Sequence, residues 1–126
     1  MCLETMRKPS REKEVFGYKV FAVNRDGHLV GRHFGKRHLK VGRIYTASRG
    51  MIKADDYLKN TTFRYRKGFH VWTSKRAAAH NASYGNRVLG VHGKYVVKRV
   101  KVWGLTAVGT QSHDNVVVGK FMKILG

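Results

Sequence analysis

Apolar and polar residues alternate along much of this chain, which is the pattern of strands that bury one face. Residues 15–23 (VFGYKVFAV) are rich in aromatic and β-branched side chains and predict a strand. Residues 24–27 supply turn chemistry, so residues 28–30 are expected to return as the second strand of a hairpin. Residues 31–40 are dense in Arg, Lys and His and predict a loop, which a short strand at residues 42–47 follows.

The second half of the chain continues the alternation. In residues 61–66 (TTFRYR) two aromatic residues alternate with two arginines, which predicts a half-exposed strand. Residues 69–72 predict another strand. The strongest signal is at residues 94–103 (KYVVKRVKVW), where valines occupy one face and basic residues the other. Residues 115–118 and 120–125 are expected to close the sheet.

Helical patterning is confined to a small part of the chain. Residues 75–83 (KRAAAHNAS) are Ala-rich and follow Thr73 and Ser74, either of which is a suitable N-cap. Residues 84–86 (YGN) are expected to end this helix, and residues 55–59 are expected to add one helical turn. The pattern predicts an α+β fold, with a small, mostly antiparallel sheet of about six to eight strands and one main helix.

The N-terminal residues differ from the rest of the chain. Residues 1–13 show no periodicity and carry Arg7, Lys8, Arg11 and Lys13, so they are expected to form a flexible basic arm. Residues 14–126 are expected to form a single α+β domain, because 126 residues with 42% hydrophobic content can bury a core of their own.

Charge is the strongest functional signal. The chain has 26 Lys and Arg against 7 Asp and Glu, a formal net charge of +19. Such a surface repels itself unless a polyanion neutralises it, so nucleic acid is the expected partner. An anionic membrane is less favoured, because no segment combines an apolar helical face with a basic one. An acidic protein surface remains an open alternative.

Cysteine content and hydropathy restrict the compartment. The single cysteine, Cys2, leaves no disulfide framework and no Cys-based zinc site. Residues 1–14 lack the apolar run of a signal peptide, and no stretch approaches the roughly 18 apolar residues of a spanning helix. We therefore expect a cytoplasmic protein that is neither exported nor inserted into a membrane.

Three groups of cations are the candidate nucleic-acid-binding residues. They are Arg32, Lys36, Arg37, Lys40 and Arg43 in the expected loop, Arg64, Arg66 and Lys67 in the first alternating strand, and Lys98, Arg99 and Lys101 in the late strand. If these two strands are neighbours, their basic residues form a positive ribbon interleaved with Tyr95 and Trp103. Cations would then hold phosphates while unpaired bases stack on the rings. The alternative is that the cations are solvated and the aromatic residues belong to the core.

The start of the expected helix is a further candidate site. Thr73, Ser74, Lys75 and Arg76 place two cations in a first turn whose free N–H groups already carry partial positive charge. This arrangement indicates a phosphate-binding site, unless both long side chains simply bend into water.

Metal and cofactor chemistry are not expected. His28, His33 and His38 lie among cations, with no Cys or acidic ligand near them in the sequence. His70 is in the opposite strand phase to Phe69 and is expected to be structural. The chain has no Walker loop, dinucleotide fingerprint, nucleophile elbow or zinc-deaminase signature. We therefore expect no cofactor and no enzymatic activity.

Short motifs along most of the chain carry a family resemblance. They are Gly17-Tyr18-Lys19 with Phe21, Val41-Gly42 with Tyr45, Gly68-Phe69-His70, Trp103-Gly104 after the Val-rich strand, and Met122-Lys123-Ile124-Leu125. With this layout, residues 15–126 resemble a small domain that is common in phages and mobile elements. The present chain is more basic than that family. Its segments 31–40 and 51–59 are longer than the corresponding segments of the family layout. The resemblance implies a phage or mobile-element context and no particular activity.

A second likeness concerns the middle of the chain. Residues 67–74, the helix and residues 96–104 are similar in layout to the strand-helix-strand centre of ADP-ribosyltransferase folds. Those enzymes usually use a late glutamate, whereas the last carboxylate here is Asp114. The RNA 2′-phosphotransferase branch works with Arg and His instead. This likeness keeps an ADP-ribosyltransferase-like or RNA-phosphate-modifying enzyme as the alternative function.

We expect this protein to act by binding a polyanion and covering it, without catalysing a reaction. A small basic phage-type protein would bind DNA or RNA, or a host nucleoprotein machine such as a ribosome, a polymerase or a CRISPR effector complex, in host takeover or as an anti-CRISPR protein. The sequence predicts neither which of DNA and RNA is bound nor the oligomeric state.

Overall fold

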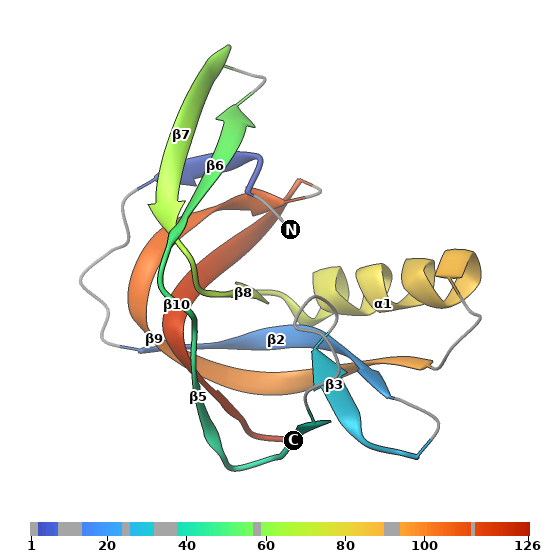
Figure 1. The fold of residues 1–126 in the computed structure, drawn as a ribbon. Helices are drawn as coiled ribbons and strands as arrows, with labels where there is room; N and C mark the ends of the chain where they lie inside the picture. The colour runs from blue at the N-terminus through green and yellow to red at the C-terminus, as the bar shows by residue number, and fades with distance from the viewer. Residues whose placement is uncertain are drawn as a thin grey trace.

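The computed structural model of the chain describes residues 3–7, 14–23, 26–31, 38–56, 59–89, 94–111 and 113–126. Its strands are β1 (Thr5–Arg7), β2 (Glu14–Val23), β3 (Leu29–Gly31), β4 (His38–Leu39), β5 (Ile44–Thr46), β6 (Met51–Asp56), β7 (Thr61–Arg66), β8 (Phe69–Trp72), β9 (Lys94–Gln111) and β10 (Asp114–Ile124), and its helix is α1 (Lys75–Leu89). The fold is α+β, with mostly antiparallel sheet and one helix, as the alternation predicts (Figure 1).

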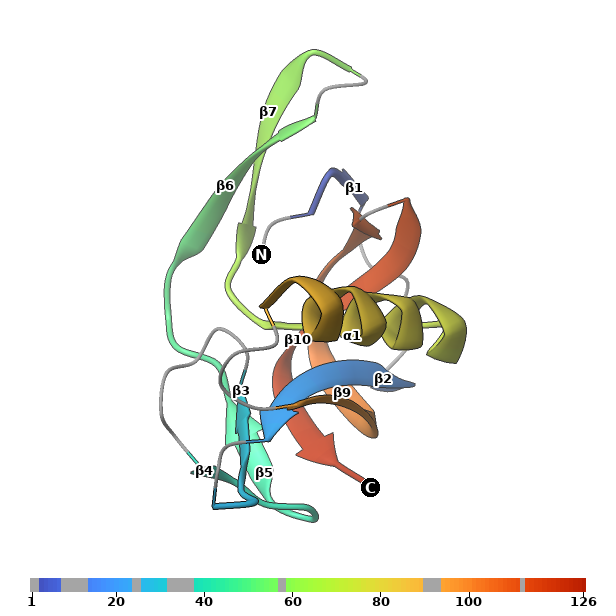
Figure 2. The same ribbon diagram turned by 90° about the vertical axis from the view of Figure 1, so that its right-hand side faces the viewer.

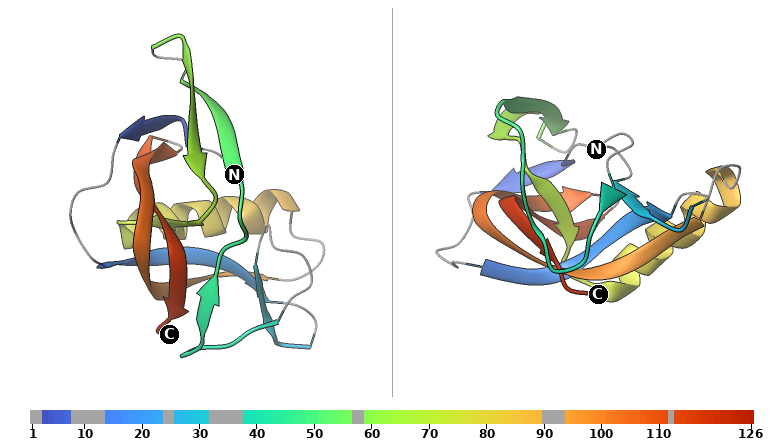
Figure 3. Two further views of the ribbon diagram at one scale, coloured as in Figure 1. Left: turned by 60° about the vertical axis from the view of Figure 1, so that its left-hand side comes forward. Right: turned by 60° about the horizontal axis from the view of Figure 1, so that its bottom comes forward.

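The long strand β9 organises the main sheet. Its first half pairs with β2, and its second half pairs with β10. The other edge of β10 pairs with β8 and, further along, with β5. Since β8 also meets β2 at Tyr18 and Trp72, the strands β2, β9, β10 and β8 form a closed ring of pairings. Figure 3 shows β10, in red, running alongside the strongly curved β9, in orange.

The strands β6 and β7 form a separate two-stranded sheet. This hairpin rises from the body at the end opposite β4 and β5 (Figures 1 and 2). Alternation divides it into two faces, because Ala54 and Tyr65 are buried while Lys53 and Arg64 are exposed.

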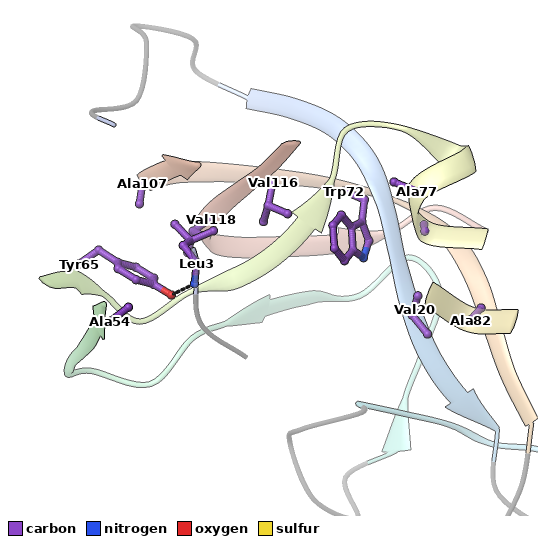
Figure 4. Close-up of a cluster of buried hydrophobic side chains, with 11 residues drawn as sticks. Leu3, Val20, Ala54, Tyr65, Trp72, Ala77, Ala82, Ala107, Val116 and Val118 are labelled. Atoms are coloured by element: carbon purple, nitrogen blue, oxygen red, sulfur yellow. Dashed lines mark hydrogen bonds between the residues drawn. The ribbon is translucent and has the colours of Figure 1, made fainter. Parts of the chain in front are cut away.

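Two hydrophobic clusters lie on opposite faces of the main sheet. One contains Phe21, Val71, Val100 and Met122, contributed by the four strands of the ring. The other lies where α1, Leu3 and the β6–β7 hairpin cover the sheet, and Figure 4 shows it. Its members are Leu3, Val20, Ala54, Tyr65, Trp72, Ala77, Ala78, Ala82, Ala107, Val116 and Val118.

Residues 3–7 are part of the fold, so the expected flexible arm is wrong for this segment. β1 pairs with the end of β9, and Leu3 is only 1% exposed. The periodicity of a three-residue strand is too short to detect from sequence. Residues 8–13, with Lys8, Arg11 and Lys13, lie outside the described residues.

Three further expectations about elements are wrong. Residues 55–56 extend β6 rather than forming a helical turn, because they pair with Thr62 and Thr61. The helix continues to Leu89, since Gly85 and Asn86 lower helix propensity without blocking the backbone hydrogen bonds as proline would. The two closing strands are one strand, β10, interrupted by an irregularity between Val118 and Gly119.

Among the described residues, no helix is long and apolar enough to cross a membrane.

Candidate nucleic-acid interface

A hollow of about 940 Å³ lies between the base of the β6–β7 hairpin and the middle of β9. Its lining residues are Met6, Ala47, Ser48, Arg49, Gly50, Met51, Arg64, Tyr65, Arg66, Lys67, Gly104, Leu105, Thr106 and Lys120. Five of them are basic and none is acidic. We call this site the basic hollow. Its volume is in the range of small-ligand sites.

Backbone contacts from three segments fix the walls of the basic hollow. Residues 47–50 follow β5. The Ala47 N–H donates a hydrogen bond to the carbonyl of Lys120 in β10 at 2.8 Å. They then reach the hairpin, where the Lys67 N–H donates to the Gly50 carbonyl at 2.9 Å. On the opposite side, the Thr106 hydroxyl donates to the Arg66 carbonyl at 3.1 Å. The base of the hairpin is thus hydrogen-bonded to residues 47–50 on one side and to β9 on the other.

Gly104 lets β9 change its course beside this hollow. Its φ is +65°, a left-handed conformation that glycine adopts readily and other residues rarely. A Cβ at this position would lie 3.1 Å from the Phe121 ring and 3.3 Å from Lys120 Cβ. The close packing and the positive φ both require glycine here.

Aromatic rings and cations continue from the basic hollow along β9 and β10. The Trp103 and Phe121 rings stack with centroids 5.7 Å apart and planes at 21°. Lys101 Nζ lies 5.5 Å from the Trp103 ring centroid, and Lys120 Nζ lies 5.3 Å from that of Phe121. Lys120 therefore belongs both to this aromatic pair and to the lining of the hollow.

Phe16 extends the surface onto β2. Its side chain is 49% exposed, and the Arg99 guanidinium carbon lies 5.2 Å from its ring centroid. Phe16 is also the register partner of Lys101, so both side chains project from the same face of the sheet. We call Phe16, Arg99, Lys101, Trp103, Lys120 and Phe121 the cation–aromatic strip.

One carboxylate lies beside the strip. Glu14 Oε2 is 3.5 Å from Lys101 Nζ, and the two side chains are 50% and 28% exposed. An ion pair this exposed is screened by water and salt and contributes little to stability. Lys101 can therefore exchange Glu14 for another anion at small cost.

Several sequence-predicted site residues meet at these two surfaces. Arg64, Arg66 and Lys67 line the basic hollow, and Arg99 and Lys101 lie on the strip. They do not form the expected ribbon.

The condition for that ribbon, that residues 61–66 and 94–103 are neighbouring strands, is not met. β7 pairs with β6, whereas this part of β9 pairs with β2 and β10. Tyr95 packs against the cluster under α1 instead of joining the surface. Lys98 is out of phase with Arg99 and faces the other side, opposite Lys19.

The remaining predicted site residues lie elsewhere. Lys40 and Arg43 are exposed near β4 and β5, at the end of the molecule away from the hairpin (Figure 2). Thr73, Ser74, Lys75 and Arg76 are exposed at the start of α1, where the Ala77 N–H donates to Ser74 Oγ at 3.3 Å. Ser74 is thus the N-cap. Arg32, Lys36 and Arg37 lie outside the described residues.

Sequence reasoning missed Arg49 and Lys120, both in the lining of the hollow. It also omitted Lys123, the register partner of Lys101. The available signals were local. Arg49 stands in a Ser-Arg-Gly turn between two strands, and Lys120 stands between a glycine and an aromatic residue.

His70 lies in a hydrogen-bonded network that connects β8, β7 and the N-terminal segment. Its Nε2 is 2.9 Å from the Tyr65 hydroxyl, which accepts a hydrogen bond from the Leu3 N–H at 3.0 Å (Figure 4). The structural role expected for His70 stays a prediction. His28 and His38 stack their rings with centroids 4.4 Å apart. Within the described ranges, no three His, Cys, Asp or Glu side chains gather as metal ligands would.

Comparisons with protein-family models, with curated proteins and with solved structures found no match to this chain.

Proposed function

We propose that this protein binds nucleic acid, either free or within a host nucleoprotein machine, and acts by occupying it rather than by chemistry. The observation that carries the proposal is the basic hollow, whose lining has five cations and no carboxylate. Lys120 joins it to the cation–aromatic strip.

Like charges in one hollow repel each other, and an external anion would relieve that repulsion. A small anion would neutralise one or two of the cations. A phosphodiester backbone supplies regularly spaced charges and releases its condensed counterions when it binds, which makes association favourable in low salt. The excess of +19 over the whole chain would add long-range attraction.

The phage resemblance extends the proposal to a biological setting. A phage-encoded protein of this kind would work in the host cytoplasm, where the polyanion is a genome, a transcript or the nucleic acid of a defence or synthesis complex. Covering phosphates would block such a machine without any catalytic step.

A salt series tests the proposal. Fluorescence anisotropy would follow the binding of labelled duplex DNA and duplex RNA to the whole protein. If about five to seven phosphates are neutralised, the logarithm of the binding constant falls against the logarithm of salt concentration with a slope of about −4 to −6 on DNA. Binding that is independent of salt, or absent in low salt, would contradict the proposal. A pull-down from host lysate with and without nuclease then separates free nucleic acid from a nucleoprotein target.

A further inference from the structure

The cation–aromatic strip differs in chemistry from a surface that only neutralises phosphates. We propose that it binds unpaired nucleic acid, with bases stacked on Trp103 and the neighbouring rings while the phosphate backbone continues into the basic hollow. This inference rests on the proposed function and adds the form of nucleic acid that the site selects.

The rings of the strip are held out of the core. Phe16, Trp103 and Phe121 belong to neither hydrophobic cluster of the described residues. Several other aromatic residues among those described are buried, such as Phe21 at 0% and Trp72 at 3% exposure. Phe16 is exposed, and Trp103 and Phe121 are half-buried. Three partly accessible rings on neighbouring strands form a surface on which planar groups can stack.

Each ring of the strip has a cation over it. Arg99, Lys101 and Lys120 lie 5.2–5.5 Å from the centroids of Phe16, Trp103 and Phe121. Cation–π contacts at exposed sites are weak, and these side chains are long. A base arriving at a ring can displace the cation, which then contacts the adjacent phosphate. One binding event would satisfy both groups.

Duplexes cannot use the rings in this way. Their bases are stacked on one another inside the helix, so a duplex offers phosphates but, away from its two ends, no free base face to the strip. A single strand offers both, and base–aromatic stacking is tolerant of sequence. The shared position of Lys120 lets the backbone pass from the strip into the hollow without a break in positive charge.

Trp103 supplies the test directly. The other tryptophan, Trp72, is 3% exposed, so a base that stacks on the protein should quench Trp103 and leave Trp72 unaffected. Single-stranded DNA and RNA of about 12 nucleotides, and the matching duplexes, would be titrated against the whole protein at one low salt concentration. We expect quenching by at least one of the single strands and none by the duplexes.

Variants extend the test to affinity. Trp103→Ala should weaken single-strand binding about tenfold, as expected for the loss of one stacked base, and should change duplex binding less than twofold. Trp103→Phe keeps a ring and should retain single-strand binding within about threefold while the quenching disappears. If circular dichroism shows that Trp103→Ala is unstable, Phe16→Ala takes its place as the test variant. Phe16 is more exposed, and its loss should likewise weaken single-strand binding.

The outcomes separate the two proposals. If neither single strand quenches Trp103, or if Trp103→Ala weakens duplex and single-strand binding equally, the strip does not stack bases, although the proposed function stands. If no oligonucleotide of either form binds in low salt, both proposals fail.

Discussion

The Trp103 and Phe121 rings stack across β9 and β10 with their centroids 5.7 Å apart, directly beside the left-handed residue Gly104. Phe121 is the register partner of Trp103 and Gly119 that of Leu105, so Gly104 lies between two paired positions of β9. Gly104, with its positive φ, thus lies both beside the half-buried ring pair and in the lining of the basic hollow.

Gly104→Ala should destabilise the fold and weaken nucleic-acid binding together. The positive φ costs an L-residue about 1–2 kcal/mol, and the added methyl group would press on Phe121 and Lys120, at a further cost of about 1 kcal/mol or more. Urea denaturation measures the sum. Gly27→Ala is the matched control, because Gly27 also has a positive φ of +80° but nothing within 4 Å of its Cβ position. Equal losses in the two variants would show that the contacts around Gly104 are unimportant.

Tyr65→Phe should lower the free energy of unfolding by about 1–3 kcal/mol, because the buried Leu3 N–H loses its acceptor and His70 loses a partner. Thermal or urea unfolding measures this loss. Tyr45→Phe is the control. The Tyr45 hydroxyl also accepts a hydrogen bond from a backbone N–H, but that N–H belongs to the exposed residue Lys40, where water can replace the hydroxyl. We expect a smaller loss there. If Tyr65→Phe were neutral, the network would not anchor the N-terminal segment.

His70→Ala tests the structural role of this histidine against a catalytic one. We expect reduced stability, with nucleic-acid binding unchanged at temperatures well below the unfolding midpoint. The alternative enzyme function requires a different result, namely label transfer from radioactive NAD to RNA or protein by the wild-type chain and its loss in the variant.

Val100→Ala separates the core from the surface. Val100 is 0% exposed in the cluster formed by the ring strands, so the truncation should cost about 2 kcal/mol of unfolding free energy. Its neighbour Arg99 is exposed, and Arg99→Gln should leave stability nearly unchanged. A large loss of stability in Arg99→Gln would mean that the strand phase is assigned incorrectly.

Local patterns in the sequence were sufficient for most strands. The alternation of residues 94–103 correctly separated Val100 from Arg99, and the turn before residues 28–30 correctly produced the β2–β3 hairpin. These signals depend only on neighbouring residues. The expected strand stops at residue 103, whereas β9 continues to Gln111 and accommodates Gly104 with a positive φ.

The site itself required tertiary information. Arg49, Arg66 and Lys120 are far apart in sequence and meet only because β10 pairs with both β5 and β9 while the hairpin folds back over them. Strand pairing is not encoded in periodicity. A β7–β9 ribbon was therefore as compatible with the sequence as the observed hollow.

The salt dependence of a double variant tests the central claim most directly. Arg64→Gln with Arg66→Gln removes two cations from the basic hollow, and Lys59→Gln with Lys94→Gln removes two exposed cations that line neither the hollow nor the strip. Anisotropy titrations of a labelled single strand would be repeated across a salt series, with circular dichroism as the check on folding. We predict that the first pair makes the slope of log binding constant against log salt shallower by about 1.4, two phosphate contacts at about 0.7 each, and that the control pair leaves the slope within about 0.3 of wild type. Equal changes in the two variants would show that net charge alone drives binding and would contradict the assignment of the site.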